Sequence, residues 1–361
     1  MRAAVCRSFG APLGIEEARL RAPGPGEVVV RVAACGICHS DVAFIDGAWG
    51  GALPAVYGHE AAGVVAEAGP GAGGLAVGDH VVVTPVRSCG RCARCGRGQP
   101  ALCEGVAPAD HVTALTNAGG ETIRQGMRTA AFASLVLVHA SQVVAVLPSL
   151  PLDAASLLAC GVITGVGAVM NTAAVEPGST VVVLGAGGVG LNCVQGALLA
   201  GAQHIIAADR VASKLDAARA FGATDVIDVT VADAADRVHK RTGGRGADYV
   251  FVAAGRGSLI ETGCAMLRRG GTLVIVGIPA AGTTVSLDPG AIADGSLRIL
   301  GSKMGASRPQ EDIPRLAELY RAGRLRLDEL ISERYEFDRI NEAIESAREG
   351  KLLRAVLIFP P

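Results

Sequence analysis

The chain has 361 residues, half of them apolar, with 33 basic and 34 acidic side chains. Its net charge is close to zero and no block of like charges stands out, which argues against nucleic acid and membrane surfaces as partners. The start, Met1 to Cys6, lacks the apolar segment of a signal peptide, and no uninterrupted apolar run approaches the length of a membrane helix. We therefore expect a cytoplasmic protein of two or three domains.

Short β runs separated by Gly and Pro fill the first 150 residues or so, with no long helix among them. This pattern is typical of strands joined by tight turns, and it predicts a mostly antiparallel β domain. The strand candidates are 28–33, 61–66, 80–84, 134–138 and 143–147.

Within this segment lies a first group of potential metal ligands, Cys35 and Cys38 to Asp41, followed by His59-Glu60. A thiolate and an imidazole are good zinc ligands, but two ligands do not complete a site. The best candidate for a third is Cys160, where the β domain ends. Three protein ligands would leave one position for water or substrate, as in a catalytic zinc site. Taken singly, each residue also fits a buried core thiol or a hydrogen-bonded histidine.

The second group is Cys89, Cys92, Cys95 and Cys103, four thiols on one short segment. In a reducing compartment clustered cysteines are more often metal ligands than disulfides. Four thiolates close a tetrahedral zinc site with no position open for substrate, and the intervening Arg91, Arg94 and Arg97 offset their charge. We predict a structural zinc, with disulfides or free thiols as the alternative.

A glycine-rich loop marks the next domain. The β-branched run Thr180–Leu184 leads into Gly185, Ala186, Gly187, Gly188, Val189 and Gly190, and a helical pattern, a second strand and Asp209 follow. This order is typical of a dinucleotide-binding βαβ unit, in which the glycines allow the tight turn and the close approach of a pyrophosphate. Asp209 can accept both ribose hydroxyls and repels a 2'-phosphate, which favours NAD. Arg210, next in the chain, could tolerate that phosphate.

Strands and helices alternate from Val162 to about Gly301, giving six strands, enough for a complete doubly wound sheet. After Lys303 the pattern changes to two amphipathic helices and a final strand near 354–359.

Together these motifs resemble the zinc-dependent medium-chain alcohol dehydrogenases over nearly the full length. The resemblance implies an α/β protein with a GroES-like catalytic domain, 1–161 and 303–361, and a Rossmann domain, 162–302. The catalytic domain would carry a structural zinc lobe at 89–103. It also implies two zinc ions per subunit, NAD, a small alcohol or aldehyde as the partner molecule, and a homodimer or homotetramer joined through the nucleotide-binding sheets.

The resemblance assigns roles to single residues. Cys38, His59 and Cys160 would hold the catalytic zinc, Glu60 would lie near it, Asp41 would orient His59, and Cys35 would be a core thiol. The expected cofactor contacts are His39, Thr164, Gly185, Gly187, Gly188, Val189, Gly190, Asp209, Arg210, Lys214, Val276, Ile278 and Arg354, the last at the pyrophosphate. Lys214 fits a solvated helix residue equally well. The expected substrate pocket contains Ser40, Trp49, Pro85 and Phe132.

The implied reaction is hydride transfer between a primary or secondary alcohol and NAD, with Ser40 accepting the alcohol proton. Pro85 stands where relatives often place an aromatic, which favours aryl or bulky substrates. Ala43 replaces a histidine that completes the proton relay in many members, so the relay route stays open. The runner-up is a thiol-dependent formaldehyde dehydrogenase, which Gly165–Ala174 resembles but Ala107 argues against. A polyol or amino-alcohol dehydrogenase and a zinc-free member are further alternatives.

Overall fold

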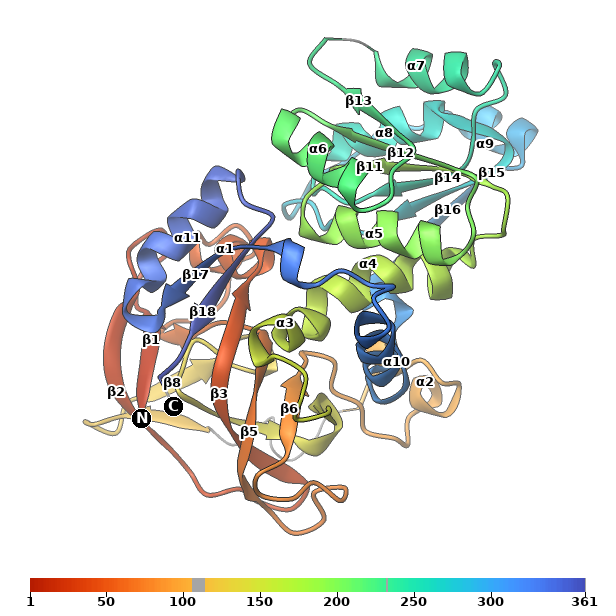
Figure 1. Cartoon of the computed structure of the whole chain (residues 1–361). Helices are drawn as coiled ribbons and strands as arrows, with labels where there is room; N and C mark the ends of the chain where they lie inside the picture. The colour runs from red at the N-terminus through yellow and green to blue at the C-terminus, as the bar shows by residue number, and fades with distance from the viewer. Residues whose placement is uncertain (106–113, 232, 361) are drawn as a thin grey trace. The chain divides into compact units, whose positions relative to one another are not determined.

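The computed structural model describes residues 1–105, 114–231 and 233–360, so Ala107 lies outside the described residues. The chain divides into a first unit, Met1–Gly161 with Arg308–Pro361, and a second unit, Val162–Ser307 (Figure 1). The sequence analysis places the first boundary after residue 161, and the N-terminal part of the first unit ends at Gly161. The return to the first unit comes after Ser307 rather than after residue 302.

Strands dominate the first unit, in a closed barrel of order β1-β2-β7-β8-β4 and a sheet of order β10-β6-β5-β3-β18-β17, with β9 beside β3. The strands are β1 Arg2–Cys6, β2 Gly14–Leu20, β3 Glu27–Ile37, β4 Ala55–Val56, β5 Glu60–Ala68, β6 His80–Val83, β7 Leu115–Asn117, β8 Thr122–Gln125, β9 Leu135–His139, β10 Val143–Ala145, β17 Ile331–Glu336 and β18 Arg354–Ile358. Among the described residues of this unit, all strand pairs are antiparallel except β4 with β8 and β17 with β18. The predicted β domain is confirmed.

The helices of the first unit are short or amphipathic: α1 His39–Ile45, α2 Ala93–Gly96, α3 Leu152–Leu157, α10 Pro309–Arg321 and α11 Ile340–Glu349. In α11 the buried residues Ile340, Ala343, Ile344 and Ala347 follow helical spacing and join the core of the sheet. The helix ends at Gly350, whose φ of 68° suits a residue without a Cβ. The C-terminal segment thus supplies part of the β domain's core.

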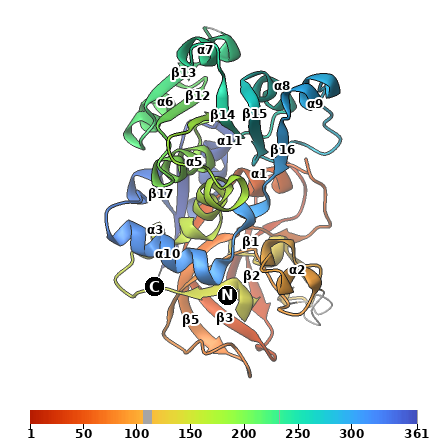
Figure 2. The same cartoon turned by 90° about the vertical axis from the view of Figure 1, so that its right-hand side faces the viewer.

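A parallel sheet of order β13-β12-β11-β14-β15-β16 forms the second unit. Its strands are β11 Thr180–Leu184, β12 His204–Asp209, β13 Asp225–Asp228, β14 Ala247–Val252, β15 Leu267–Ile275 and β16 Arg298–Gly301, and its helices are α4 Ile163–Gly167, α5 Gly188–Leu199, α6 Ala212–Ala220, α7 Ala234–Arg241, α8 Gly257–Ala265 and α9 Pro289–Gly295. Helices cover both faces (Figures 1 and 2). Strands buried on two sides read as continuous apolar runs, as Thr180–Leu184 does. The doubly wound α/β fold is confirmed.

The chain is helical from Leu152 to Ala173, with π-helical stretches at Leu158–Val162 and Ala168–Ala173. By length and average composition this run is apolar enough to cross a membrane, although polar residues such as Asp153 and Thr164 interrupt it, and 89% of its apolar 18-residue window is buried inside the protein. A core helix passes the same test, because burial among apolar neighbours selects the same side chains.

Candidate metal centres and cofactor-binding loop

Four buried side chains of the first unit, those of Cys38, His59, Glu60 and Cys160, converge on one point. Their potential ligand atoms all lie within 4.8 Å of one another. Cys38 lies between β3 and α1, His59 immediately before β5, and Cys160 in the π-helical stretch that follows α3. The structure therefore brings together the three residues expected to bind the catalytic zinc, with Glu60 beside them.

Asp41 fixes this arrangement through three contacts. Its Oδ2 accepts from the backbone N–H of Cys38 at 3.1 Å, and its Oδ1 accepts from that of Gly58 at 3.0 Å. The same Oδ1 lies 2.9 Å from Nδ1 of His59. One carboxylate thus connects the N-terminus of α1 with the loop that carries His59.

The His59 ring fits a metal ligand. Because Asp41 holds Nδ1, the other nitrogen, Nε2, is left without a hydrogen-bond partner among the described residues, although it is fully buried. Burial alone would lower the pKa of His59, but the charge of Asp41 and its hydrogen bond raise it well above its ordinary value. A buried imidazole nitrogen without a partner, beside two thiols and oriented by a carboxylate, is a donor set typical of zinc.

The thiols of Cys38 and Cys160 interact, and their pKa values shift in opposite directions. Hydrogen bonding with Cys160 lowers the pKa of Cys38 well below its ordinary value, and the same bond, together with burial, raises the pKa of Cys160. A cation bound here would favour the thiolate form of both side chains, since thiolates rather than thiols are metal ligands.

Two features that support this centre were not predicted from the sequence. The π-helical stretch Leu158–Val162 carries Cys160, and π-bulges are frequent at functional sites. Thr84 donates its hydroxyl to the carbonyl of Ala159 at 2.7 Å and thereby connects the end of β6 with that stretch. A threonine after a strand and a π-helical turn have no distinctive sequence pattern, so nothing short of the fold could have identified them.

Behind the ligands lies a buried ion pair. Nη2 of Arg354 is 3.2 Å from Oε1 of Glu60, and its Nη1 donates to the carbonyl of Ile37 at 3.3 Å. Burial raises the pKa of Glu60 to about 7, although Arg354 opposes that shift. The Arg354 guanidinium, which was expected at the cofactor pyrophosphate, therefore lies against Glu60 in this structure.

Two glycines leave room for this ion pair. A Cβ on Gly36 would lie 2.5 Å from Oε2 of Glu60, and one on Gly161 would lie 2.3 Å from Nη2 of Arg354. Both distances are shorter than real Cβ contacts, so a side chain at either position would displace the pair. This role depends on a close approach between distant segments, which the sequence does not reveal.

The expected pocket residues fall in different settings. Ser40 is half-buried in α1 and Pro85 is half-buried just after β6, whereas His39 is exposed. Trp49 packs edge-on against Phe44 at 5.1 Å between ring centroids, and Phe44 stacks on the buried Tyr57 at 5.5 Å. Phe132 is fully buried in the core. Phe44 and Tyr57 were not among the predicted residues, although Tyr57 precedes His59 by only two positions.

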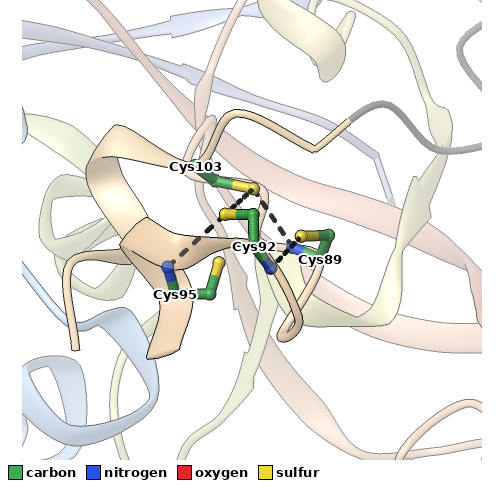
Figure 3. A group of neighbouring side chains, drawn as sticks. All are labelled: Cys89, Cys92, Cys95 and Cys103. Carbon is green, nitrogen blue, oxygen red and sulfur yellow. Dashed lines mark hydrogen bonds between the residues drawn. The ribbon is translucent and has the colours of Figure 1, made fainter. Parts of the chain in front are cut away.

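The second candidate metal centre is the cysteine lobe, Cys89 to Cys103 (Figure 3). The ligand atoms of Cys89, Cys92, Cys95 and Cys103 lie within 4.8 Å of one another, on half-buried side chains. The backbone N–H groups of Cys89, Cys92 and Cys95 donate to sulfur atoms of the group, at 3.3 to 3.5 Å. Such bonds, first of all that from the N–H of Cys95, lower the pKa of Cys92 to about 6. The group fits a tetrahedral all-thiolate zinc site.

In the second unit, the glycine loop lies between β11 and α5. Gly185 has a φ of 96°, and a Cβ on Gly190 would lie 1.8 Å from the carbonyl oxygen of Gly185, so the turn excludes side chains there. A Cβ added to Gly187 would meet only Nζ of Lys214, at 4.0 Å, which leaves this face of the loop open. The backbone N–H groups at the start of α5 fit a pyrophosphate.

Asp209 ends β12 beside this loop. Its Oδ2 accepts from the N–H of Ala186 at 2.7 Å, and its Oδ1 accepts from those of Arg210 and Val211 at 2.7 and 3.0 Å. Lys214 is buried rather than solvated, and burial lowers its pKa while the charge of Asp209 opposes that shift. The carboxylate, the ammonium and the glycine loop are thus neighbours, as a site for an adenosine ribose requires.

The remaining expected cofactor contacts lie in the same unit. Thr164 donates its hydroxyl to the sulfur of Met304 at 3.8 Å. Val276 and Ile278 follow β15, and Ile278 is 65% exposed, which is unusual for a large aliphatic side chain and fits a surface that a ligand covers.

Comparison with known proteins identifies the family of proteins that this chain resembles. Residues 24–149 match the model of the alcohol dehydrogenase GroES-like domain, and residues 188–322 match that of zinc-binding dehydrogenases. An NDMA-dependent alcohol dehydrogenase of Amycolatopsis methanolica is 36% identical over 99% of this chain and 98% of its own.

Two solved structures are similar over the full chain. An alcohol dehydrogenase zinc-binding domain protein from Burkholderia ambifaria is 40% identical with a TM-score of 0.95, covering 100% of this chain and 99% of its own. The benzyl alcohol dehydrogenase from Acinetobacter calcoaceticus is 33% identical with a TM-score of 0.93, covering 99% of each chain.

Proposed function

The chain belongs to the zinc-binding alcohol dehydrogenase family, and on that premise we propose that it transfers a hydride between an alcohol and NAD, giving the aldehyde or ketone. Alcohol oxidoreduction follows from the family. The choice of NAD, the presence of two zinc ions per subunit and the preference for aryl or bulky alcohols are the proposal.

One observation carries the proposal: the convergence of Cys38, His59 and Cys160, with the buried Nε2 of His59 left without a partner among the described residues. Three such donors leave a fourth position for substrate. Zinc bound there would polarise an alcohol oxygen, and NAD would accept the hydride.

Residues of this chain would orient the zinc ligand and accept the proton of the alcohol. Asp41 holds His59 in the tautomer that leaves Nε2 free. Ser40, half-buried in the first turn of α1 close to Cys38 in the chain, is the group we assign to accept the alcohol proton. Ala43 lies one turn further along α1 and cannot continue a proton relay, so we assign that step to water.

The test measures zinc per subunit together with NAD reduction over a panel of alcohols. We expect two zinc ions and alcohol oxidation without added thiol. Cys38→Ser should lose one zinc and the activity, whereas the matched variant Cys35→Ser, which changes a buried thiol outside the ligand set, should keep both. Activity that survives in Cys38→Ser would instead support a zinc-free member of the family.

The preference for aryl or bulky alcohols rests on Pro85, which is smaller than an aromatic residue, and on the likeness to a benzyl alcohol dehydrogenase. We expect a higher kcat/KM for benzyl alcohol than for ethanol. The opposite order would contradict this part of the proposal and leave the rest intact.

The thiol-dependent formaldehyde dehydrogenase is the second candidate, supported by the likeness of Gly165–Ala174 to that branch. Adding formaldehyde, with and without a thiol, to the panel of alcohols distinguishes it, because formaldehyde would then be oxidised only when a thiol is added. We further propose a cytoplasmic homodimer or homotetramer, in line with the resemblance, and its mass in solution is the measurement that tests the oligomer.

A further inference from the structure

A surface hollow of about 530 Å³ lies in the first unit, outside both metal centres. Residues from β3, β5, the start of α3, β17 and the end of β18 line it: Arg31, Ala33, Ala34, Val64, Leu152, Asp153, Arg334, Ile358, Phe359 and Pro360. The volume falls within the range of small-molecule sites, about 300 to 1,000 Å³.

The walls of the hollow are apolar. Seven of the ten lining residues, from Ala33 to Pro360, have hydrocarbon side chains, and they come from segments far apart in the sequence. The hollow lies where β3 changes partners along its length, pairing with β9 up to Arg31 and with β18 from Ala34. Such a surface favours an alkyl chain or a ring over a polar solute.

The charged residues at the hollow are not equivalent. Arg334 is already neutralised, because its Nε and Nη2 both lie 2.8 Å from Oδ2 of Asp153. Arg31 is exposed, and among the residues that the structure describes no acidic group pairs with it. One guanidinium beside an apolar hollow is therefore available to an anion.

We propose that this hollow binds a monocarboxylate with an apolar body, such as a medium-chain fatty acid. The carboxylate would pair with Arg31, since a guanidinium matches the two oxygens of a carboxylate, and the chain would cover the alanine, valine and leucine walls. A single available cation matches a single negative charge. Asp153 disfavours a more highly charged anion because its own carboxylate lies at the same opening.

Octanoate is the probe, and its binding to the full-length protein is measured by titration calorimetry or ligand-observed NMR. Arg31→Gln should weaken octanoate binding about tenfold, the usual cost of losing a charge-assisted hydrogen bond. The same variant should leave the weaker binding of 1-octanol unchanged. Arg19→Gln, which removes an exposed arginine from β2, is the matched control and should bind octanoate as the parent does.

A second variant tests the apolar walls. Ala33→Leu fills part of the hollow and should weaken both octanoate and octanol, with circular dichroism and thermal unfolding confirming that the variant folds. Absence of octanoate binding, equal affinity for octanoate and octanol, or unchanged octanoate binding in Arg31→Gln would each overturn the proposal. None of these results depends on zinc, NAD or alcohol oxidation.

Discussion

Asp209 performs two tasks with one carboxylate. It accepts from the N–H of Ala186 in the glycine loop and from Arg210 and Val211 after β12, so it stabilises the loop in addition to the ribose-binding role that we propose for it. We predict that Asp209→Gly raises KM for NAD about tenfold or more and improves the use of NADP, because the carboxylate that repels a 2'-phosphate is gone.

The measurement is kcat/KM for both cofactors, with Asp216→Asn on the exposed face of α6 as control. If the ratio of the two kcat/KM values stayed constant, Asp209 would have no part in cofactor choice. A loss of folded protein in the variant would point to the loop-stabilising bonds instead.

Gly161 illustrates a role that size alone determines. Its missing Cβ leaves space for Arg354, which would otherwise meet it at 2.3 Å. We predict that Gly161→Ala destabilises the protein by about 1–3 kcal/mol, the usual cost of overpacking a core, and lowers zinc retention by displacing the Glu60–Arg354 pair.

Unfolding in denaturant and zinc content after dialysis check this prediction, and Gly301→Ala is the control because no atom lies within 4 Å of the added Cβ. Equal stability of the two variants would mean that the ion pair adjusts without cost.

At the residue scale, the sequence predicts ligands better than it predicts their surroundings. Cys38, His59 and Cys160 have recognisable motifs, and the structure brings them together. Gly36, Gly161 and Thr84 have none, because each matters only through a neighbour that is far away in the chain.

Among the elements, the amino ends of β11, β14 and β15 are joined by Asp248. Its Oδ2 accepts from the N–H of Thr180 at 2.7 Å, and Arg268 and Arg245 pair with the same carboxylate. Burial alone would raise the pKa of Asp248, but these hydrogen bonds and charges lower it below its ordinary value.

We predict that Asp248→Asn lowers the free energy of unfolding by about 1–3 kcal/mol at neutral pH, since it removes charge-assisted hydrogen bonds from a buried group. A carboxylate whose pKa is lower in the folded state stabilises above its unfolded pKa, and the effect is lost as pH falls through the folded value. The difference between parent and variant should therefore shrink below about pH 4.

Urea unfolding of both proteins at several pH values provides the test, with Asp294→Asn, an exposed partner of Arg269, as control. A difference that does not change with pH would assign the effect of Asp248 to packing rather than to its charge.

The ends of the strands cannot be predicted from the alternation of apolar and polar residues alone. β3 extends over Glu27–Ile37 rather than 28–33, because β18 from the far end of the chain pairs with its second half. β10 ends at Ala145 rather than at Leu147, since its partner β6 pairs only with Val143 to Ala145. A strand ends where its partner ends, and the partner is not visible locally.

At the scale of the whole molecule, the two metal centres are built differently. Cys38, His59 and Cys160 are buried and come from three segments, whereas the four cysteines of the lobe are half-buried and lie close together in sequence. The lobe's four potential ligands come from one short segment, and a four-thiolate zinc site would contribute folding free energy directly. Loss of zinc from one centre should therefore leave the other centre intact.

We predict that Cys103→Ser and Cys160→Ser each lose one zinc ion but with opposite consequences. Cys103→Ser should lower the melting temperature by several degrees, as the loss of a few kcal/mol does, and should keep alcohol oxidation below that temperature. Cys160→Ser should change the melting temperature less than Cys103→Ser does. It should lower kcat/KM at least about a hundredfold, because it removes a ligand rather than a supporting group. Zinc content, thermal unfolding and NAD reduction on the same preparations separate the two.

Loss of activity and stability together in both variants would show that the lobe and the buried centre act as one cooperative unit. The separation of a structural from a catalytic zinc would then be wrong for this chain.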